Sequence, residues 1–88
     1  MLNKNVKAIL DTSKEKDVDL FVARDMLIAE NPEDKVEIMK ASDFIHAHYD
    51  AVTKCRRMGD DAKIEKLCEL QQTDAEAFKA LLEEIKAM

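Results

Sequence analysis

The chain has 88 residues and a formal net charge of −5, with 47% hydrophobic, 38% charged and 5% aromatic residues and no Trp. This length leaves room for one domain, residues 1–88, because globular domains typically run to about 100–150 residues. One Gly and one Pro are too few turn formers for a protein of many short strands, so we expect a small all-α domain.

The charge of the chain and its apolar runs exclude two classes of partner. Residues 60–88 carry four basic and eight acidic side chains, a net charge of −4. Duplex nucleic acid is not an expected partner, because its binding relies on many Lys and Arg contacts to phosphate. No apolar run approaches the roughly 18 residues that span a bilayer, so no membrane partner is expected either. Without a secretory signal pattern we expect a cytoplasmic protein with reduced thiols.

The first third of the sequence predicts one or two short helices. The spacing of Leu2, Val6, Ile9 and Leu10 is typical of an amphipathic helix that ends near residues 11–13. Nine of the twelve residues in the next segment, Val18 to Ala29, are apolar. A helix that is apolar on nearly all sides is expected to be buried on nearly all sides.

A long helix is predicted over residues 32–58. Asn31 suits its N-cap and Pro32 suits its first position. Apolar residues then recur at spacings of three and four without a breaker before Gly59, which is placed to end the helix at positive φ.

A second long helix is predicted over residues 61–87, antiparallel to the first across the short connection at Gly59. Thr73 and Glu76 have the spacing of a capping box, which would start a separate helix. The apolar stripe passes through Thr73 without a change of phase, and this favours one continuous helix.

Two long helices expose more lateral surface than one 12-residue segment can cover, so the bundle is expected to be completed by oligomerisation. The segment before the hairpin is the predicted assembly interface, with a second copy of the chain as partner. Ion pairs of Arg24 and Asp25 across this interface are expected, because a desolvated Arg needs a carboxylate, and a specific recognition role is the alternative. The predicted interface residues are Val18, Phe21, Val22, Met26 and Leu27.

The candidate metal ligands do not match a structural zinc site. His46 and His48 lie about 200° apart on a helix, so they cannot chelate together. His48, Cys55 and Cys68 lie on inward stripes, but Cys68 is expected to align with about residue 52 rather than with Cys55. Zinc usually needs four closely spaced ligands, so no metal or other cofactor is predicted. For His48 we favour a core or interface residue that is hydrogen-bonded to a neighbour such as Gln71 or Gln72, and a ligand-binding or pH-sensing role is the alternative.

The hairpin bend carries a basic cluster in this acidic chain. Its residues are Lys54, Arg56, Arg57, Lys63 and Lys66. Cations in the last turn of a helix complement its dipole, and this explains the first three without a ligand. A weak anion-binding site at Lys54, Arg56, Arg57 and Lys63 is the alternative.

Signatures of catalysis are missing, because the chain has no phosphate-binding Gly loop, nucleophile elbow or His-Glu-x-x-His sequence. We therefore expect no enzyme. The first hypothesis is a protein-interaction module, such as an adaptor, inhibitor or antitoxin-like subunit. The second is an oligomeric binder that sequesters a phosphate-bearing molecule at the basic bend.

Overall fold

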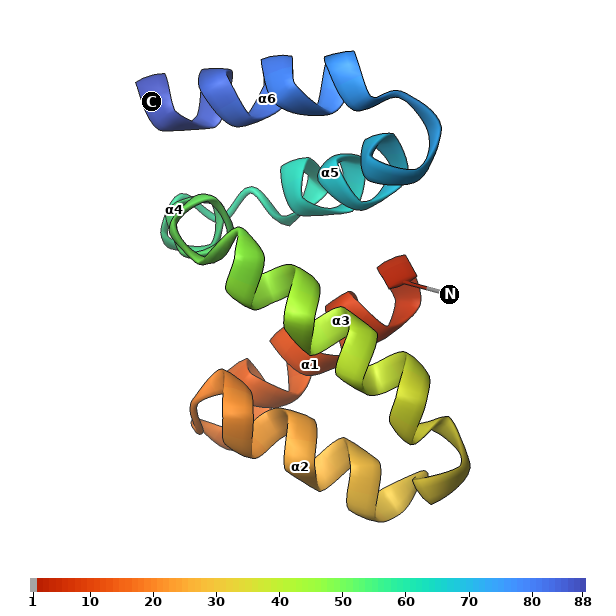
Figure 1. Cartoon of the computed structure of the whole chain (residues 1–88). Helices are drawn as coiled ribbons and strands as arrows, with labels where there is room; N and C mark the ends of the chain where they lie inside the picture. The colour runs from red at the N-terminus through yellow and green to blue at the C-terminus, as the bar shows by residue number, and fades with distance from the viewer. Residues whose placement is uncertain (1) are drawn as a thin grey trace. The chain divides into compact units, whose positions relative to one another are not determined.

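The computed structural model describes residues 2–88, which are helical almost throughout and contain no strand (Figure 1). This confirms the all-α class. The elements in chain order are α1 (Leu2–Lys16), α2 (Leu20–Glu30), the 3-10 turn η1 (Pro32–Asp34), α3 (Lys35–Ala47), α4 (Tyr49–Arg57), α5 (Asp61–Thr73) and α6 (Ala75–Ala87). No helix within residues 2–88 is both long and apolar enough to cross a membrane.

The helices form two compact units, the first ending at Ala47 and the second spanning His48–Met88. In the first unit, α1, α2 and α3 all contact one another. In the second unit, α4, α5 and α6 do the same. A division into two compact units does not test whether residues 1–88 fold as a single domain, so that statement stays a prediction.

Helix α1 is longer than the sequence pattern indicated. The predicted end near residues 11–13 was wrong, because the helix continues through Ser13 to Lys16. Ser13 is buried, and its hydroxyl donates a hydrogen bond to the carbonyl of Val18 at 2.6 Å. The helix ends where Asp17 adopts a positive φ of 53°. Ser13 thus joins the end of α1 to the chain that leads into α2.

The helix predicted over residues 32–58 is interrupted at His48, whose φ of −125° and ψ of 35° leave the helical region. Its first residues, Pro32–Asp34, form the 3-10 turn rather than α-helix. The two halves also have different packing partners, since α3 contacts α1 and α2 whereas α4 contacts α5 and α6. The single long helix was therefore a wrong prediction, and the break lets each half bury its apolar residues within its own unit.

The turn at Gly59 is the predicted one. Gly59 has φ of +71°, and its amide donates to the carbonyl of Arg56 at 3.1 Å. The amide of Asp60 donates to the carbonyl of Cys55 at 2.9 Å. This pair of bonds is a Schellman motif, which closes α4 with a residue in the left-handed region. The Asp60 side chain then accepts from the Lys63 amide and caps α5.

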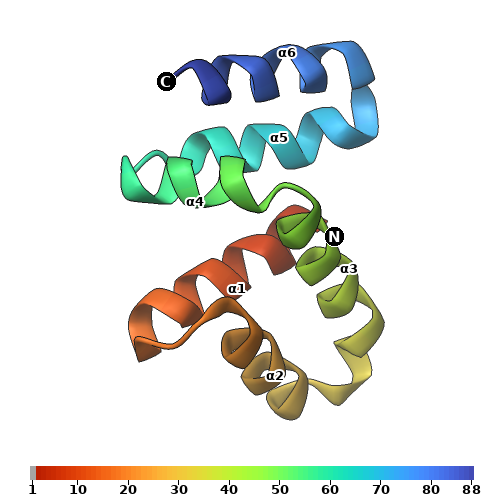
Figure 2. The same ribbon diagram turned by 60° about the vertical axis from the view of Figure 1, so that its left-hand side comes forward.

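The helix predicted over residues 61–87 is also interrupted, at Asp74, whose φ is −155° and ψ is 94°. Asp74 is the cap of α6, because its carboxylate accepts a hydrogen bond from the Ala77 amide at 3.1 Å. Thr73 instead ends α5, and its hydroxyl donates back to the carbonyl of Glu69. The break lets α6 return alongside α5 and contact α4 (Figure 2). Ile85 of α6 is completely buried in this arrangement, so the continuous helix predicted over residues 61–87 was wrong.

Candidate interaction surface

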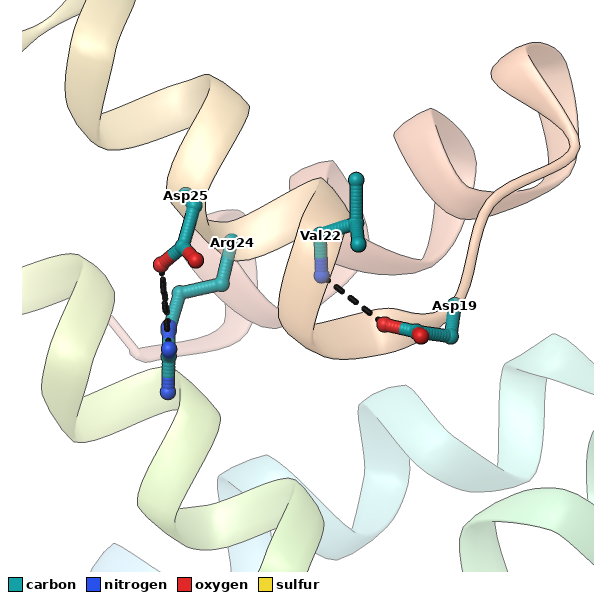
Figure 3. A network of polar contacts seen from close by, with 4 residues as sticks. All are labelled: Asp19, Val22, Arg24 and Asp25. Atoms are coloured by element: carbon teal, nitrogen blue, oxygen red, sulfur yellow. Dashed lines mark hydrogen bonds and ion pairs between the residues drawn. The ribbon is translucent and has the colours of Figure 1, made fainter.

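Helix α2 is a short helix with a defined cap at each end. The Asp19 carboxylate accepts a hydrogen bond from the Val22 amide at 2.9 Å, which satisfies a free donor of the first turn (Figure 3). At the other end, the backbone amide and the side-chain amide of Asn31 both donate to the carbonyl of Leu27. Asn31 therefore ends α2, and it is also the N-cap residue of η1, as the sequence predicted, although its side chain caps no amide there. These caps fix the 11 residues between them.

Most of the apolar side chains of α2 are not buried. Ala23 is the one buried residue of this helix, at 0% exposure, whereas Phe21 is 49% and Val22 is 42% exposed. The single chain therefore does not bury this helix on nearly all sides, and its burial by a second copy of the chain stays a prediction. The reason is geometric, because α1 and α3 cover the side of α2 that contains Ala23 and leave other sides uncovered.

The exposed residues of α2 include Phe21, Val22, Asp25 and Ala29, and we call this set the α2 face. Their positions are separated by one, three or four residues, so they share one side of a helix. The five predicted interface residues divide accordingly. Phe21 and Val22 belong to the exposed face, whereas Val18, Met26 and Leu27 are half-buried.

An aromatic stack holds Phe21 in place. Its ring lies on the imidazole of His46 from α3, with 4.2 Å between the ring centroids and 26° between the planes. The guanidinium of Arg24 lies 5.1 Å from the centroid of the same ring, within the range of a cation–π contact. His46 is a residue whose role sequence reasoning missed, because nothing local shows that α3 returns next to Phe21.

Arg24 and Asp25 form an ion pair with each other, with 3.0 Å between Nη2 and Oδ1 (Figure 3). The Arg24 side chain is only 20% exposed, whereas that of Asp25 is 66% exposed. Pairing of both residues across a subunit interface was expected from the sequence, whereas within one chain they pair with each other. Arg24 is thus turned towards Phe21, and the carboxylate of Asp25 is the accessible charge of the α2 face.

The predicted anion site at the hairpin bend is partly occupied by the chain's own polar groups. Lys54 donates from Nζ to the carbonyl of Lys86 at the end of α6, at 3.0 Å. Lys63 lies 2.9 Å from a carboxylate oxygen of Asp60. The hydrogen bond between these two groups lowers the pKa of Asp60 and raises that of Lys63.

Arg57 is exposed and Arg56 is half-buried at the same bend. Neither guanidinium forms an ion pair within residues 2–88, whereas Lys66 lies 3.7 Å from Glu69. The structure therefore leaves the two arginines as the accessible cations of the predicted anion site.

His48 lies at the break between α3 and α4 and is half-buried. Its ring approaches that of Phe78 edge-on, with 5.0 Å between the centroids, and burial lowers the pKa of the imidazole. The predicted hydrogen-bond partners, Gln71 and Gln72, are exposed.

Both thiols are buried, at 0% exposure for Cys55 and 2% for Cys68. Burial raises the pKa of Cys55 and raises that of Cys68 to about 11. Protonated thiols are poor nucleophiles and poor metal ligands. In the described part of the chain, no three His, Cys, Asp or Glu side chains are grouped so that they could hold a metal ion.

The α2 face is therefore the surface on which neighbouring apolar side chains are left exposed to solvent. Comparison with known protein families, with curated proteins and with solved structures found no match to this chain.

Proposed function

We propose that this chain is a small, non-enzymatic protein-interaction module that binds another protein on the α2 face. The observation that carries this proposal is the exposure of Phe21 and Val22 on a helix that buries only Ala23. Exposed apolar side chains that cluster on one face mark sites of association more often than scattered ones do.

The organisation of the α2 face supports binding rather than a loosely folded helix. Capping hydrogen bonds of Asp19 and Asn31 fix both ends of α2, and the Phe21 ring stacks on the imidazole of His46. A side chain that is ordered before binding loses less entropy when a partner arrives. Aromatic residues and Arg are also the types that are most enriched at the energetic centres of interfaces.

The alternative of a phosphate-binding protein has less support. Lys54 and Lys63 already interact with a backbone carbonyl and a carboxylate, so two of the four proposed ligands are engaged. We also propose a cytoplasmic location for the protein, as the sequence predicts.

Site-specific photo-crosslinking in the native host tests the proposal. A photoreactive residue replaces Val22 in one variant and Val36 in a control variant, since Val36 is 66% exposed and lies on α3 outside the α2 face. We expect a defined protein to be crosslinked from position 22 but not from position 36. Identical products at both positions, or no protein product from position 22, would contradict the proposal.

A further inference from the structure

The bend between α4 and α5 also carries an exposed apolar side chain, and charged residues lie close to it in sequence. Met58 is 57% exposed and lies at the C-cap of α4, next to the accessible Arg57. Residues 54–66 contain five basic and three acidic side chains, a net charge of +2. We call Arg56, Arg57, Met58 and Lys66 the bend surface.

The α2 face has the opposite charge around its apolar side chains. Residues 19–30 contain Asp19, Asp25 and Glu30 against the single basic residue Arg24, a net charge of −2. The three acidic residues are exposed, whereas the Arg24 side chain is mostly covered. One chain therefore carries two surfaces of opposite net charge, one with Phe21 and Val22 exposed and one with Met58 exposed.

We propose that the bend surface of one copy binds the α2 face of a second copy, so that the chains associate head to tail. This inference rests on the proposed function and names the partner as the chain itself. In this contact Met58 packs against Phe21 and Val22, while Arg57 approaches the accessible carboxylate of Asp25. Both surfaces lose apolar area from water, and opposite charges meet.

Charge also decides against a symmetric contact between two α2 faces. A two-fold axis places the same surface on both sides of an interface, so two regions of net charge −2 would meet. The head-to-tail contact instead brings the α2 region, with a net charge of −2, against the bend region, with a net charge of +2. A single contact of this kind leaves one free surface on each of the two copies, so the copies can close into a ring, of which a reciprocal dimer is the smallest, or add as an open chain.

The expected association is weak and sensitive to salt. Each surface comes from one helix or one bend, which places the contact at or below the lower end of specific interfaces, about 1,200 Å² in total. The charges involved are exposed, and salt screens such charges over distances of about 10 Å at 0.1 M ionic strength.

Sedimentation velocity on the full chain, at several concentrations and at low and high salt, measures this association. The average mass should rise with concentration at low salt and fall when salt is added. Val22→Asp disables the α2 face and Met58→Asp disables the bend surface. Both positions are substantially exposed, so both variants should fold, which circular dichroism can verify.

Mixing the two variants separates head-to-tail contact from symmetric contact. Each variant alone should be monomeric, because each lacks one of the two surfaces. Their mixture should form a one-to-one dimer that cannot grow, since it contains one intact copy of each surface. Val36→Asp is the matched control and should associate as the wild type does, because Val36 lies outside both surfaces.

Charge reversal provides a second version of the same experiment. Asp25→Lys and Arg57→Glu should each weaken association, and mixing these two variants should restore part of it, because the reversed charges again match. Association of Met58→Asp alone, or a mixture of the aspartate variants that stays monomeric, would overturn the head-to-tail contact.

A wild-type chain that is monomeric at every concentration would also overturn this inference. The proposed function would survive that result if position 22 still crosslinked another protein. It would fail separately if position 22 gave no protein product.

Discussion

The Phe21 ring of α2 stacks on the His46 imidazole of α3, with 4.2 Å between their centroids. Because Phe21 is 49% exposed, this stack is a major restraint on a residue that packing covers only in part. The pair therefore links the stability of the first unit to the shape of the surface that we propose for binding.

A double-mutant cycle with Phe21→Leu and His46→Gln tests this stack. We expect a coupling free energy of about 0.5–1.5 kcal/mol, as measured for aromatic pairs in other proteins. Urea denaturation followed by circular dichroism gives the four free energies of unfolding. The control cycle replaces His46→Gln with Val36→Ala, whose exposed side chain should give an additive result. Additive effects for the Phe21 and His46 pair would show that the stack contributes nothing.

Asp74 is expected to contribute more to stability than Thr73, its neighbour. Asp74→Ala removes the side-chain bond to the Ala77 amide and should lower the free energy of unfolding by about 1 kcal/mol. Thr73→Ala removes only an exposed hydroxyl that bonds back to Glu69, so its effect should be smaller. Chemical denaturation of the two variants compares them directly. A larger loss for Thr73→Ala would mean that α6 begins at the capping box that the sequence also contains.

The end of α4 was predictable from the sequence because its determinants are local. A left-handed residue closes the helix, Gly adopts that conformation most readily, and Gly59 is the only Gly in the chain. The caps of α2 and α5 are local in the same way, since Asp19 and Asp60 each bond to an amide three residues later. Signals that act within a few residues can be read without knowing the fold.

The breaks at His48 and Asp74 could not be read from the apolar pattern. That pattern stays in phase through both positions, and neither is Gly or Pro. The breaks accompany packing that the apolar pattern does not show, since α4 and α6 contact α5 and also each other. The stack of His46 on Phe21 was missed for the same reason, since 25 positions separate the two residues. The predicted interface was chosen from composition and stays a prediction, whereas the exposure of its residues depends on tertiary contacts.

Gly59→Ala should destabilise the protein through the backbone alone. The φ of Gly59 is +71°, and a Cβ atom added there meets nothing within 4 Å. An L-residue other than Gly costs roughly 1–2 kcal/mol in the left-handed region, and Asn tolerates this region better than Ala. Thermal unfolding should therefore rank the wild type first, Gly59→Asn second and Gly59→Ala last. Equal stability of all three would contradict the requirement for a positive φ.

The two thiols should react slowly in the folded protein. With the pKa of Cys68 raised to about 11, about one thiol in a thousand is ionised at pH 8, and Cys55 is shifted in the same direction. A chromogenic disulfide reagent should therefore label both residues slowly under native conditions and rapidly in denaturant. Cys55→Ala and Cys68→Ala variants assign the two reactions. Rapid native labelling of either residue would show that the second unit opens readily.

His48 should make the stability of the protein depend on pH near neutrality. Burial lowers its pKa in the folded state, so the unfolded chain binds a proton more readily. The unfolded pKa is about 6.5, and the stability that the neutral ring provides is therefore present above this pH. It is lost as the pH falls from there through the lowered folded pKa. The lowered pKa of Asp60 acts at a more acidic pH, below about 3.9, and does not overlap with this window.

The pH dependence of His48 is measured against a variant that does not titrate. The melting temperature of the wild type should fall between about pH 7.5 and pH 5 more steeply than that of His48→Gln. Subtracting the two curves cancels the contribution of groups present in both proteins. Parallel curves would mean that protonation of His48 does not oppose folding. A steeper fall for the wild type would instead make the junction between α3 and α4 sensitive to mild acid, because the protonated ring is disfavoured in its half-buried position beside Phe78.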